Sequence, residues 1–309
     1  MKKFFLNKKV LITGATGFKG SWLSLWMYKF GAKVLGIADD FPTNPSNFRD
    51  LNLSKKINFK KIDIQNFKLL QKEIIKFQPD FIFHLAAQAI VKKSVENPRH
   101  TWSVNTLGTV NILESLKQMK KKIIIVMITS DKVYKNLEIQ RGYVETDILG
   151  SLDPYSASKA AADLAIQSYM TFILKNKKNI QLCIARAGNV IGGGDWALGR
   201  IVPDCMRQWS SGKILKIRNP NSTRPWQHVL DVLNGYMTLA IKLKKNRNLN
   251  AETFNFGPKK EKKREVINIV KEMSSIWKKG KWKIQRDRNL KESNLLQLNS
   301  RKAKLKIGW

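Results

Sequence analysis

Short apolar runs rich in β-branched residues alternate with longer segments of helical spacing through the first two-thirds of the chain. The runs predict buried strands, because short apolar runs enclosed by turn signals are typical of a covered sheet. The longer segments predict helices that pack on those strands. The expected strands cover residues 9–13, 33–38, 57–64, 80–86, 123–129 and 180–185, and the expected helices cover residues 21–30, 67–77, 101–119 and 155–174.

This alternation favours right-handed crossovers between parallel strands, with helices on both faces of one sheet. We therefore expect an α/β protein with a Rossmann-type, doubly wound parallel sheet. The rhythm ends after Asn189, where glycines 192–194 and several prolines divide shorter elements. The break predicts a main domain at residues 1–189. Residues 190–309 would form mainly a smaller C-terminal lobe, with some elements returning to the main sheet.

The first expected strand runs into Thr13-Gly14-Ala15-Thr16-Gly17-Phe18-Lys19-Gly20, and a helix follows. Here Gly14 can form the tight turn, Gly17 can let the backbone approach a pyrophosphate, and Gly20 can let helix and strand pack closely. Free N–H groups at the helix N-terminus attract phosphates. An ordinary glycine-rich turn is the alternative. The strand–loop–helix context favours a dinucleotide bound by Gly14, Thr16, Gly17, Phe18, Lys19 and Gly20.

Two carboxylates follow the second expected strand, about 20 residues beyond the last glycine. Asp39 and Asp40 can accept hydrogen bonds from ribose hydroxyls and would repel a 2′-phosphate, which favours NAD over NADP. Ala38 takes the position directly after the strand core, so the acid lies slightly off its usual place. Asp63 and Ile64, at the end of the third expected strand, could contact adenine, and a helix N-cap is the equal alternative there.

Tyr155-Ser156-Ala157-Ser158-Lys159 opens an expected helix, and the spacing of four places Tyr155 and Lys159 on one helical face. A nearby ammonium stabilises a tyrosinate, so we expect the Tyr155 pKa to be lowered. Such a tyrosinate can take a proton from a sugar hydroxyl while hydride leaves the carbon. The motif alone is common, but its place after a glycine loop and a fifth strand favours the catalytic interpretation.

The fifth expected strand ends in Thr129-Ser130-Asp131-Lys132. The carboxyl ends of parallel strands carry the site in such folds. Ser130 can hydrogen-bond a reacting hydroxyl. Asp131 and Lys132 place an acid and a base side by side, and a loop-exposed ion pair is the alternative that the residues alone leave open.

The net charge of +34 directs attention to nucleic acid as a partner. The lysines are spread over expected helix faces and loops, and only residues 259–264 and the tail from Lys278 form runs. Runs of this kind are usually solvated surface. We expect no specific nucleic-acid partner, whereas the same charge attracts an anionic cofactor and substrate.

No run of 18 or more apolar residues occurs, so we expect no membrane partner. Residues 1–6 are followed by Lys8 and Lys9 without a cleavage site, and we expect a cytoplasmic protein. Cys183 and Cys205 lie in apolar segments and have no CxxC partner. They predict two buried thiols and no metal site.

Six strings along the chain carry a further signal. They are Thr16-Gly17-Phe18-Lys19-Gly20-Ser21-Trp22, His84-Leu85-Ala86-Ala87-Gln88, Ser130-Asp131-Lys132, Tyr155-Ser156-Ala157-Ser158-Lys159, Ala187-Gly188-Asn189-Val190-Ile191-Gly192-Gly193-Gly194-Asp195-Trp196 and Arg224-Pro225-Trp226-Gln227-His228-Val229. Together they resemble those of CDP-glucose 4,6-dehydratases, within the extended short-chain dehydrogenase/reductase family, and the resemblance extends from about residue 8 to the end. Most extended members share the glycine loop and the Tyr155–Lys159 motif, and far fewer combine them with the remaining strings.

The resemblance implies a dehydration with NAD as cofactor. Tyr155 would remove the sugar 4-hydroxyl proton while C4 gives hydride to NAD. Lys132 would then remove the C5 proton, Asp131 would protonate the departing C6 hydroxyl, and hydride would return to C6. Ser130 and Lys159 would assist, residues 1–189 would bind NAD, and Leu85, Ala86, Ala87 and Asn105 would add cofactor contacts.

The resemblance also implies a nucleotide-sugar substrate, CDP-glucose, held mainly by residues 190–309. Arg224 resembles the family's diphosphate-binding arginine, and Asn189 its backbone-holding asparagine. Further candidates for substrate contact are Gln88, Arg200 and Arg218, with a structural or surface role as the alternative for each arginine. Trp196 and Trp226 could stack on the pyrimidine or lie in the core, and His84 and His228 are interpreted as structural.

Family members usually continue for some tens of residues beyond the position of Trp309, and a histidine–glutamate pair is common where this chain has Lys291-Glu292. The resemblance therefore implies an incomplete C-terminal lobe. It also implies a homodimer or homotetramer built on the helices at 101–119 and 155–174.

Two alternatives stay open. One is an NAD-dependent 4-epimerase, or a 4,6-dehydratase for another nucleotide sugar; an epimerase needs Tyr155 and Lys159 but not Asp131 and Lys132. The other is a non-catalytic NAD-fold protein that binds RNA.

Overall fold

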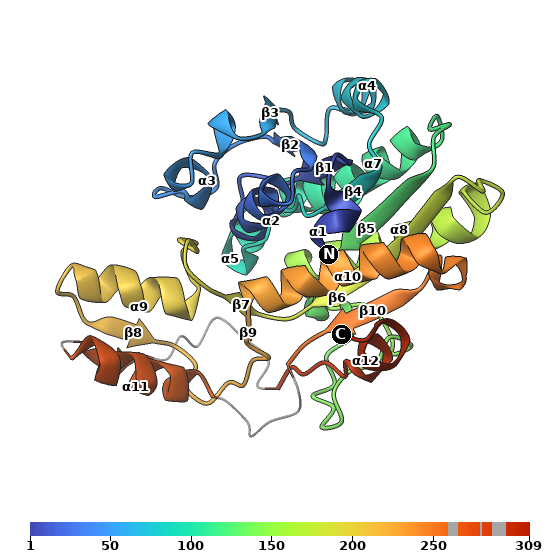
Figure 1. Ribbon diagram of the computed structural model, residues 1–309. Coiled ribbons are helices and arrows are strands. Elements are labelled where there is room, and N and C mark those ends of the chain that lie inside the picture. Colours follow the sequence, from blue (N-terminus) through green and yellow to red (C-terminus); the bar gives the residue numbers. More distant parts are fainter. Residues whose placement is uncertain (259–264, 279, 286–294) are drawn as a thin grey trace.

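A seven-stranded parallel sheet forms the centre of the molecule (Figure 1). The computed structural model describes residues 1–258, 265–278, 280–285 and 295–309. The strand order is β10-β6-β5-β4-β1-β2-β3, and every neighbouring pair is parallel. This confirms the Rossmann-type, doubly wound α/β fold. The strands are β1 (Lys9–Thr13), β2 (Lys33–Ala38), β3 (Asn58–Lys61), β4 (Phe81–His84), β5 (Ile123–Ile128), β6 (Ile180–Ala187) and β10 (Thr253–Phe256).

Helices cover both faces of this sheet. On one face α2 (Phe18–Lys29), α10 (Val229–Lys245) and α12 (Arg301–Ile307) share a core with the sheet, and on the other α4 (Phe67–Phe77), α7 (Gly108–Leu116) and α8 (Pro154–Ser168) do so. All six residues of β5 are apolar and buried, and they enter the two cores alternately. A continuous apolar run can therefore form a strand here, because both of its faces are covered.

Two of the expected long helices contain a π-helical segment. The expected helix at 101–119 divides into α6 (Pro98–Trp102), the π-helix η2 (Ser103–Leu107) and α7, while α8 continues into the π-helix η4 (Tyr169–Ile173). The Asn105 side chain in η2 hydrogen-bonds the Gln88 backbone and the Ser158 hydroxyl. At Gly108, the first residue of α7, an added Cβ would lie 2.5 Å from Ile64 Cδ1. Tertiary contacts of this kind override the helical pattern.

The third expected strand, at 57–64, is shorter than predicted. Pairing with β2 covers only Asn58–Lys61, and Ile62 and Ile64 are buried beyond the strand end. Apolar residues that enter the core from the following loop extend the apolar run without extending the strand.

A second group of elements follows residue 190. Helices α9 (Ile201–Ser210) and α11 (Val266–Trp277) pack with the parallel pair β8 (Leu215–Ile217) and β11 (Trp282–Ile284), away from the main sheet in Figure 1. The strands β7 (Val190–Ile191) and β9 (Gln227–His228) pair beside them. In contrast, α10 and β10 belong to the main sheet and its core. The boundary at residue 189 stays a prediction.

Short elements complete the described chain. They are α1 (Lys2–Phe5), α3 (Asn47–Asp50), η1 (Leu53–Lys55), α5 (Val91–Glu96), η3 (Asp131–Val133) and η5 (Arg247–Leu249). No helix in the described part of the chain is long and apolar enough to cross a membrane.

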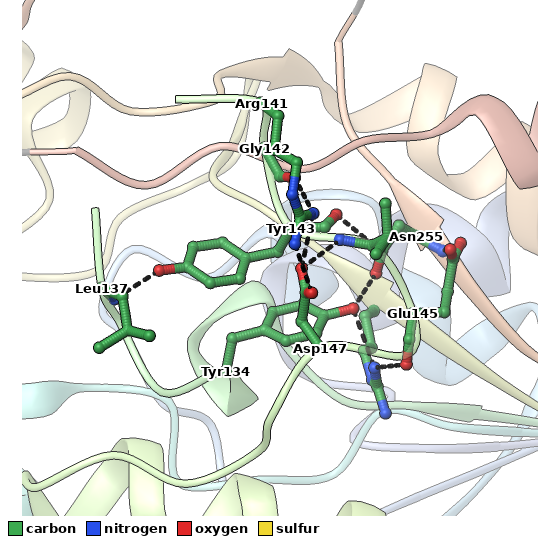
Figure 2. Close-up of polar contacts among 10 residues, drawn as sticks. Tyr134, Leu137, Arg141, Gly142, Tyr143, Glu145, Asp147 and Asn255 are labelled. Atoms are coloured by element: carbon green, nitrogen blue, oxygen red, sulfur yellow. Dashed lines mark hydrogen bonds and ion pairs between the residues drawn. The ribbon is translucent and has the colours of Figure 1, made fainter. Parts of the chain in front are cut away.

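A buried ion pair ties β6 to α8 beneath the carboxyl edge of the sheet. Arg186 donates through Nε and Nη2 to both carboxylate oxygens of Asp163, at 2.9 and 2.8 Å. Arg186 also donates to the Tyr134 hydroxyl at 2.8 Å. Figure 2 shows the Asn255 side chain of β10 beside Tyr134 and the backbone of Tyr143. It accepts from the Tyr134 hydroxyl at 2.7 Å and donates to the Tyr143 carbonyl at 2.8 Å. The network thus fixes the loop that follows the Ser130–Lys132 segment.

We expect Arg186→Met to lower the free energy of unfolding by about 3–5 kcal/mol, because it leaves the Asp163 carboxylate charged and unpaired in the core. Denaturant unfolding measures the change. Arg141→Met is the matched control, because Arg141 is an exposed residue that pairs with Asp147 (Figure 2). This substitution should leave the midpoint of denaturant unfolding nearly unchanged. Equal losses from both substitutions would contradict the role assigned to the buried pair.

Candidate active site

The glycine loop between β1 and α2 leaves space for a phosphate group. Gly14 has a φ of +69°, and a Cβ there would lie 2.8 Å from the Ala86 nitrogen. A Cβ at Gly20 would lie 2.0 Å from the Gly14 carbonyl oxygen. At Gly17, the N-cap of α2, a Cβ would have one neighbour within 4 Å among the described residues, the same oxygen at 3.3 Å. Gly14 and Gly20 are therefore required by the loop itself, and Gly17 keeps its outer side open, as a dinucleotide pyrophosphate requires.

These contacts predict unequal effects of two alanine substitutions. Gly20→Ala should lower the free energy of unfolding by about 1–3 kcal/mol or more, because the methyl group overlaps backbone. Gly17→Ala should change stability little but weaken NAD binding, because its methyl group occupies the open side. Thermal unfolding and calorimetric titration with NAD check the pair. The interpretation of the loop fails if both variants lose the same stability and Gly17→Ala binds NAD normally.

The carboxylates expected at the ribose lie directly after β2. Asp39 and Asp40 are exposed, and the Thr16 hydroxyl donates to the Asp40 carbonyl at 2.6 Å, which holds the glycine loop against this segment. Their contact with ribose stays a prediction.

The Asp63 carboxylate accepts from the backbone and side chain of Gln65, both at 2.9 Å. Asn66, whose side chain accepts from Leu69, is the N-cap of α4, so the helix-cap alternative for Asp63 is wrong. Ile64 is buried against Gly108. An adenine contact by Asp63 and Ile64 stays a prediction.

Residues after β4 are held by buried hydrogen bonds. His84 lies between the hydroxyls of Thr13 and Thr109, at 2.7 and 3.2 Å, and burial together with Lys159 lowers its pKa to about 3. It is therefore neutral and structural. The Thr13 hydroxyl also accepts from the Ala86 N–H at 3.2 Å, which leaves Leu85, Ala86 and Ala87 beside the glycine loop.

Asn105 acts at the same edge through its neighbours. Its side chain accepts from the Gln88 N–H at 2.8 Å and donates to the Gln88 carbonyl at 3.1 Å and to the Ser158 hydroxyl at 2.9 Å. These bonds connect the loop after β4 with α8. The Gln88 amide itself donates to the Thr101 hydroxyl at 3.0 Å. In the structure Asn105 positions this loop, and a direct cofactor contact stays a prediction.

Tyr155 and Lys159 occupy the first turns of α8. The helix begins where Asp153 accepts from the Ser156 N–H at 2.9 Å, and Pro154 follows as its first residue. Lys159 is buried and donates through Nζ to the Ile128 carbonyl at 3.2 Å, so its ammonium lies at the end of β5. Burial lowers the Lys159 pKa to about 8.

The Ser130–Lys132 segment lies at the same edge, after β5. The Ser130 hydroxyl donates to Asp131 Oδ1 at 3.1 Å and accepts from the Lys132 N–H at 3.2 Å. Asp131 is 3% exposed, and its Oδ2 is buried without a hydrogen-bond partner among the described residues. Burial raises the Asp131 pKa, against the opposing effects of Lys132, the Ser130 hydrogen bond, Arg224 and Lys19. Asp131 is thus no loop-exposed half of an ion pair, and a carboxyl with a raised pKa suits a proton donor.

The Tyr155 pKa differs from the expectation. Burial raises it, and the hydrogen bond from Ser130 and the charge of Arg200 only partly oppose this effect. The lowering expected from Lys159 does not occur, because withdrawing the phenolate from water outweighs the nearby cations.

The candidate substrate arginines lie in different surroundings. Arg224 donates to the Thr223 carbonyl at 2.9 Å, and its charge opposes the rise of the Asp131 pKa. Arg200 pairs with Asp195 at 3.0 Å, and its charge opposes the rise of the Tyr155 pKa. The charge of Arg218 acts instead on Asp204 of α9. The first two charges therefore lie near the catalytic residues.

The backbone around Asn189 is fixed by β9, because its carbonyl accepts from the Gln227 N–H at 3.0 Å. His228 is exposed and caps α10 by accepting from the Leu230 N–H at 3.2 Å, which confirms its structural interpretation. Trp196 and Trp226 are both partly exposed, and Lys291-Glu292 lies outside the described residues.

The GDP-mannose 4,6-dehydratase family matches residues 11–309 of this chain. The chain belongs to that family. The CDP-glucose 4,6-dehydratase of Salmonella typhimurium is 41% identical over 313 residues, covering 100% of this chain and 87% of the relative.

Solved structures share the fold. The epimerase Mth375 of Methanothermobacter thermautotrophicus has a TM-score of 0.85 at 24% identity, covering 99% of this chain and 88% of that chain. The dTDP-glucose 4,6-dehydratase of Bacillus anthracis, in complex with NAD, has a TM-score of 0.79 at 23% identity, covering 98% of this chain and 91% of that chain. These relatives are enzymes, which disfavours the non-catalytic RNA-binding alternative. The chain is an NAD-dependent sugar-nucleotide dehydratase of the extended short-chain type.

The motif assigned Lys19 to cofactor binding only, but the structure also places it near the candidate catalytic residues. Its ammonium interacts with Asp131, Lys159 and Arg200, and burial is the main cause that lowers its pKa to about 8. Lys19 thus lies near the candidate catalytic residues as well as in the glycine loop. The Gly17-Phe18-Lys19-Gly20 motif could have indicated this position for Lys19, because α2 begins at the carboxyl edge of the sheet, where the catalytic residues were expected.

Tyr236 of α10 was missed altogether. It is fully buried, Lys19 Nζ lies 5.8 Å from its ring centroid, and its hydroxyl has no hydrogen-bond partner among the described residues. Burial raises its pKa, and the charges of Asp131 and Tyr155 add to this effect, so it lies near both residues. No sequence pattern marks it, because an aromatic residue inside an amphipathic helix is typical of a core. Among the described residues, no group of His, Cys, Asp or Glu could hold a metal ion.

Proposed function

We propose that this chain converts CDP-glucose into CDP-4-keto-6-deoxy-glucose. The observation that carries the proposal is the buried Asp131, followed by Lys132 and hydrogen-bonded to Ser130, at the sheet edge where α8 places Tyr155 and Lys159. The 41% identity to the CDP-glucose dehydratase supports the choice of sugar nucleotide.

The first half of the reaction, oxidation at C4, needs a base that removes the proton of the sugar 4-hydroxyl. Tyr155 in its phenolate form takes the proton of that hydroxyl and becomes a phenol, and Ser130 holds the oxygen in place. Bound NAD would supply the hydride acceptor at C4 and the hydride donor at C6. Lys159 stabilises negative charge that develops at the end of β5, where its ammonium is held by the Ile128 carbonyl.

The second half needs an acid and a base across C5 and C6. The 4-ketone acidifies the C5 proton, which Lys132 removes and later returns. Asp131 protonates the C6 oxygen, which leaves as water. The burial that raises the Asp131 pKa keeps a proton on this carboxyl more readily than an exposed aspartate would.

Positive side chains near these residues suit the substrate diphosphate. The charges of Arg224 and Arg200 both act on the catalytic residues, and arginine matches phosphate oxygens with two donors. We assign Arg224 to binding of the diphosphate and Asn189 to positioning of the substrate. We assign Gln88, Arg200 and Arg218 to further contacts with the nucleotide sugar. Residues 190–309 would then bind most of the nucleotide sugar.

The described surface also supports a homodimer or homotetramer. Leu107 on η2, Leu164 on α8 and Phe172 on η4 are exposed apolar side chains on the helices proposed for subunit contact. Covering them with a second copy would remove apolar area from water.

The test is incubation of purified protein with NAD and CDP-glucose, with dTDP-glucose in parallel. We expect a 4-keto-6-deoxy product from CDP-glucose without net reduction of NAD. Stoichiometric reduced NAD would contradict the proposal. Clean formation of a C4 epimer would establish the 4-epimerase alternative instead.

NAD should bind more tightly than NADP, because Asp39 and Asp40 place negative charge after β2 where the ribose would lie. Asp39→Asn and Asp40→Asn should reduce this preference. Calorimetric titration with both cofactors decides the point, and exposed Asp50→Asn is the control. Tighter NADP binding by the unmodified protein would show that nearby lysines outweigh the carboxylates.

A further inference from the structure

The loop at residues 188–195, here called the substrate loop, follows β6 and carries Asn189, to which the proposed function gives the positioning of the substrate. Two other strings of the sequence, residues 16–22 and 224–229, contact this loop. On one side β7 pairs with β9, and the Gln227 N–H donates to the Asn189 carbonyl at 3.0 Å. The opposite side of the loop contacts the helix that follows the glycine loop.

Trp22 of α2 holds that opposite side. Its indole Nε1 donates to the Gly193 carbonyl at 2.8 Å. An indole N–H can only donate, so the bond fixes both the ring and the carbonyl in direction. Trp22 lies little more than one turn beyond Gly17, the N-cap of α2. The substrate loop is therefore bonded to the helix whose N-terminus is arranged for the cofactor pyrophosphate.

A second set of contacts connects the glycine loop with the substrate loop. The Ser21 hydroxyl donates to the Gly17 carbonyl at 2.9 Å and accepts from the side-chain amide of Asn47 at 2.9 Å. Asn47 is buried. Gly194 has a φ of +83°, and a Cβ there would overlap the Asn47 side chain. Gly194 thus packs directly on Asn47, and only a glycine fits this position without strain.

We propose that Trp22 is a positioning residue that joins the NAD-binding helix α2 to the substrate loop, so that NAD and the nucleotide sugar strengthen each other's binding. NAD on the glycine loop orders the first turns of α2 and the segment that leads from Asp39 to Asn47. The substrate loop rests on these elements, so it then loses less conformational freedom when a nucleotide sugar binds. Such coupling is reciprocal, and the bound nucleotide sugar retains NAD in turn.

The proposed reaction benefits from this connection. Hydride that leaves C4 returns to C6 of the same sugar, so neither ligand can depart between the two transfers. The Trp22 bond ends on a backbone carbonyl of the substrate loop rather than on Tyr155, Asp131 or Lys132. Its effect is therefore on binding and not on the chemical steps. The inference rests on the proposed function, and it names the contact that links the two ligands.

The test uses CDP as the probe, because CDP is not converted and lacks the sugar that would meet the nicotinamide. Calorimetric titration gives its dissociation constant on the full chain freed of NAD and on the full chain with saturating NAD. The ratio of the two constants is the coupling factor, which we expect to be about tenfold in the unmodified protein. Trp22→Phe keeps an aromatic ring and removes the donor. It should lower the coupling factor by about 2–10-fold, the usual effect of one hydrogen bond.

Trp26→Phe is the matched control. Trp26 lies one turn further along α2 and packs on Phe30, with ring centroids 6.1 Å apart. Its replacement should leave the coupling factor unchanged. Gly194→Ala gives an independent variant, because its methyl group separates the substrate loop from Asn47 while Trp22 is intact. It should also lower the coupling factor. Thermal unfolding of each variant with NAD bound reports whether the fold is intact.

Steady-state turnover of CDP-glucose separates binding from chemistry. Trp22→Phe should raise the KM for CDP-glucose by about 2–10-fold and leave kcat unchanged, as expected for a residue that acts only on binding. A residue with a merely structural role would weaken CDP binding by the same factor with and without NAD.

The inference is overturned if NAD leaves the affinity of the unmodified protein for CDP unchanged. It is also overturned if Trp22→Phe has the coupling factor of the unmodified protein. If NAD and CDP couple through Trp22 while the unmodified protein does not convert CDP-glucose, the proposed function fails and this inference stands.

Discussion

Replacing Tyr155 with phenylalanine should slow oxidation of the sugar 4-hydroxyl by roughly 10²–10⁴-fold, the usual effect of a positioned acid or base. The ring is kept, and the start of α8 depends on Asp153 and Pro154 rather than on the phenol. The loss should therefore lie in the rate of NAD reduction at single turnover and not in folding or substrate binding.

Tyr169→Phe is the matched control. Tyr169 lies in η4, directly after α8, and its hydroxyl donates to Glu114 at 2.5 Å, outside the catalytic residues. Its removal should leave the oxidation rate unchanged. If Tyr155→Phe still reduces NAD at the unmodified rate, the base at the 4-hydroxyl is another group.

Lys132→Met should retain oxidation at C4 and lose the elimination, by a similar 10²–10⁴-fold. Methionine keeps much of the length of the side chain but cannot accept a proton. In deuterated water the variant should form reduced NAD and a 4-keto sugar while the C5 hydrogen no longer exchanges with solvent. Mass spectrometry of the product measures that exchange.

Lys135→Met, which changes an exposed lysine three residues further along the same loop, should leave exchange and turnover unchanged. Normal C5 exchange in Lys132→Met would mean that a different base acts there. Lys19 would be the first candidate, because its ammonium interacts with Asp131 and its pKa is lowered to about 8.

Six of the seven strands of the central sheet followed from local pattern, chiefly because most of them are buried on both faces, whereas β10 was not predicted. β1 and β2 have the bounds that their apolar runs predict. The third strand was predicted too long, since Ile62 and Ile64 serve the core from a loop. The π-helices η2 and η4 could not be predicted, because they depend on contacts between segments far apart in the sequence, such as Asn105 with Gln88 and Ser158.

The candidate site, like the fold, could be predicted from the sequence only in part. Tyr155, Lys159 and the Ser130–Lys132 segment were found because short spacings and strand ends determine which residues meet. The direction of the Tyr155 pKa was predicted wrongly, because spacing reveals a neighbouring charge but not burial. The positions of Tyr236 and Lys19 near Asp131 could not be predicted from the sequence, because only the fold brings α10 and α2 to the same buried carboxylate.

The most direct test of a 4,6-dehydration follows the hydrogen on C4. CDP-glucose carrying deuterium at C4 is incubated with the protein and NAD, and the product is analysed by mass spectrometry and NMR. Our account predicts that the deuterium appears on C6 of a 4-keto-6-deoxy sugar, because the hydrogen that leaves C4 returns within the same active site. Deuterium retained at C4 of an epimer, or released into the cofactor pool, would contradict it.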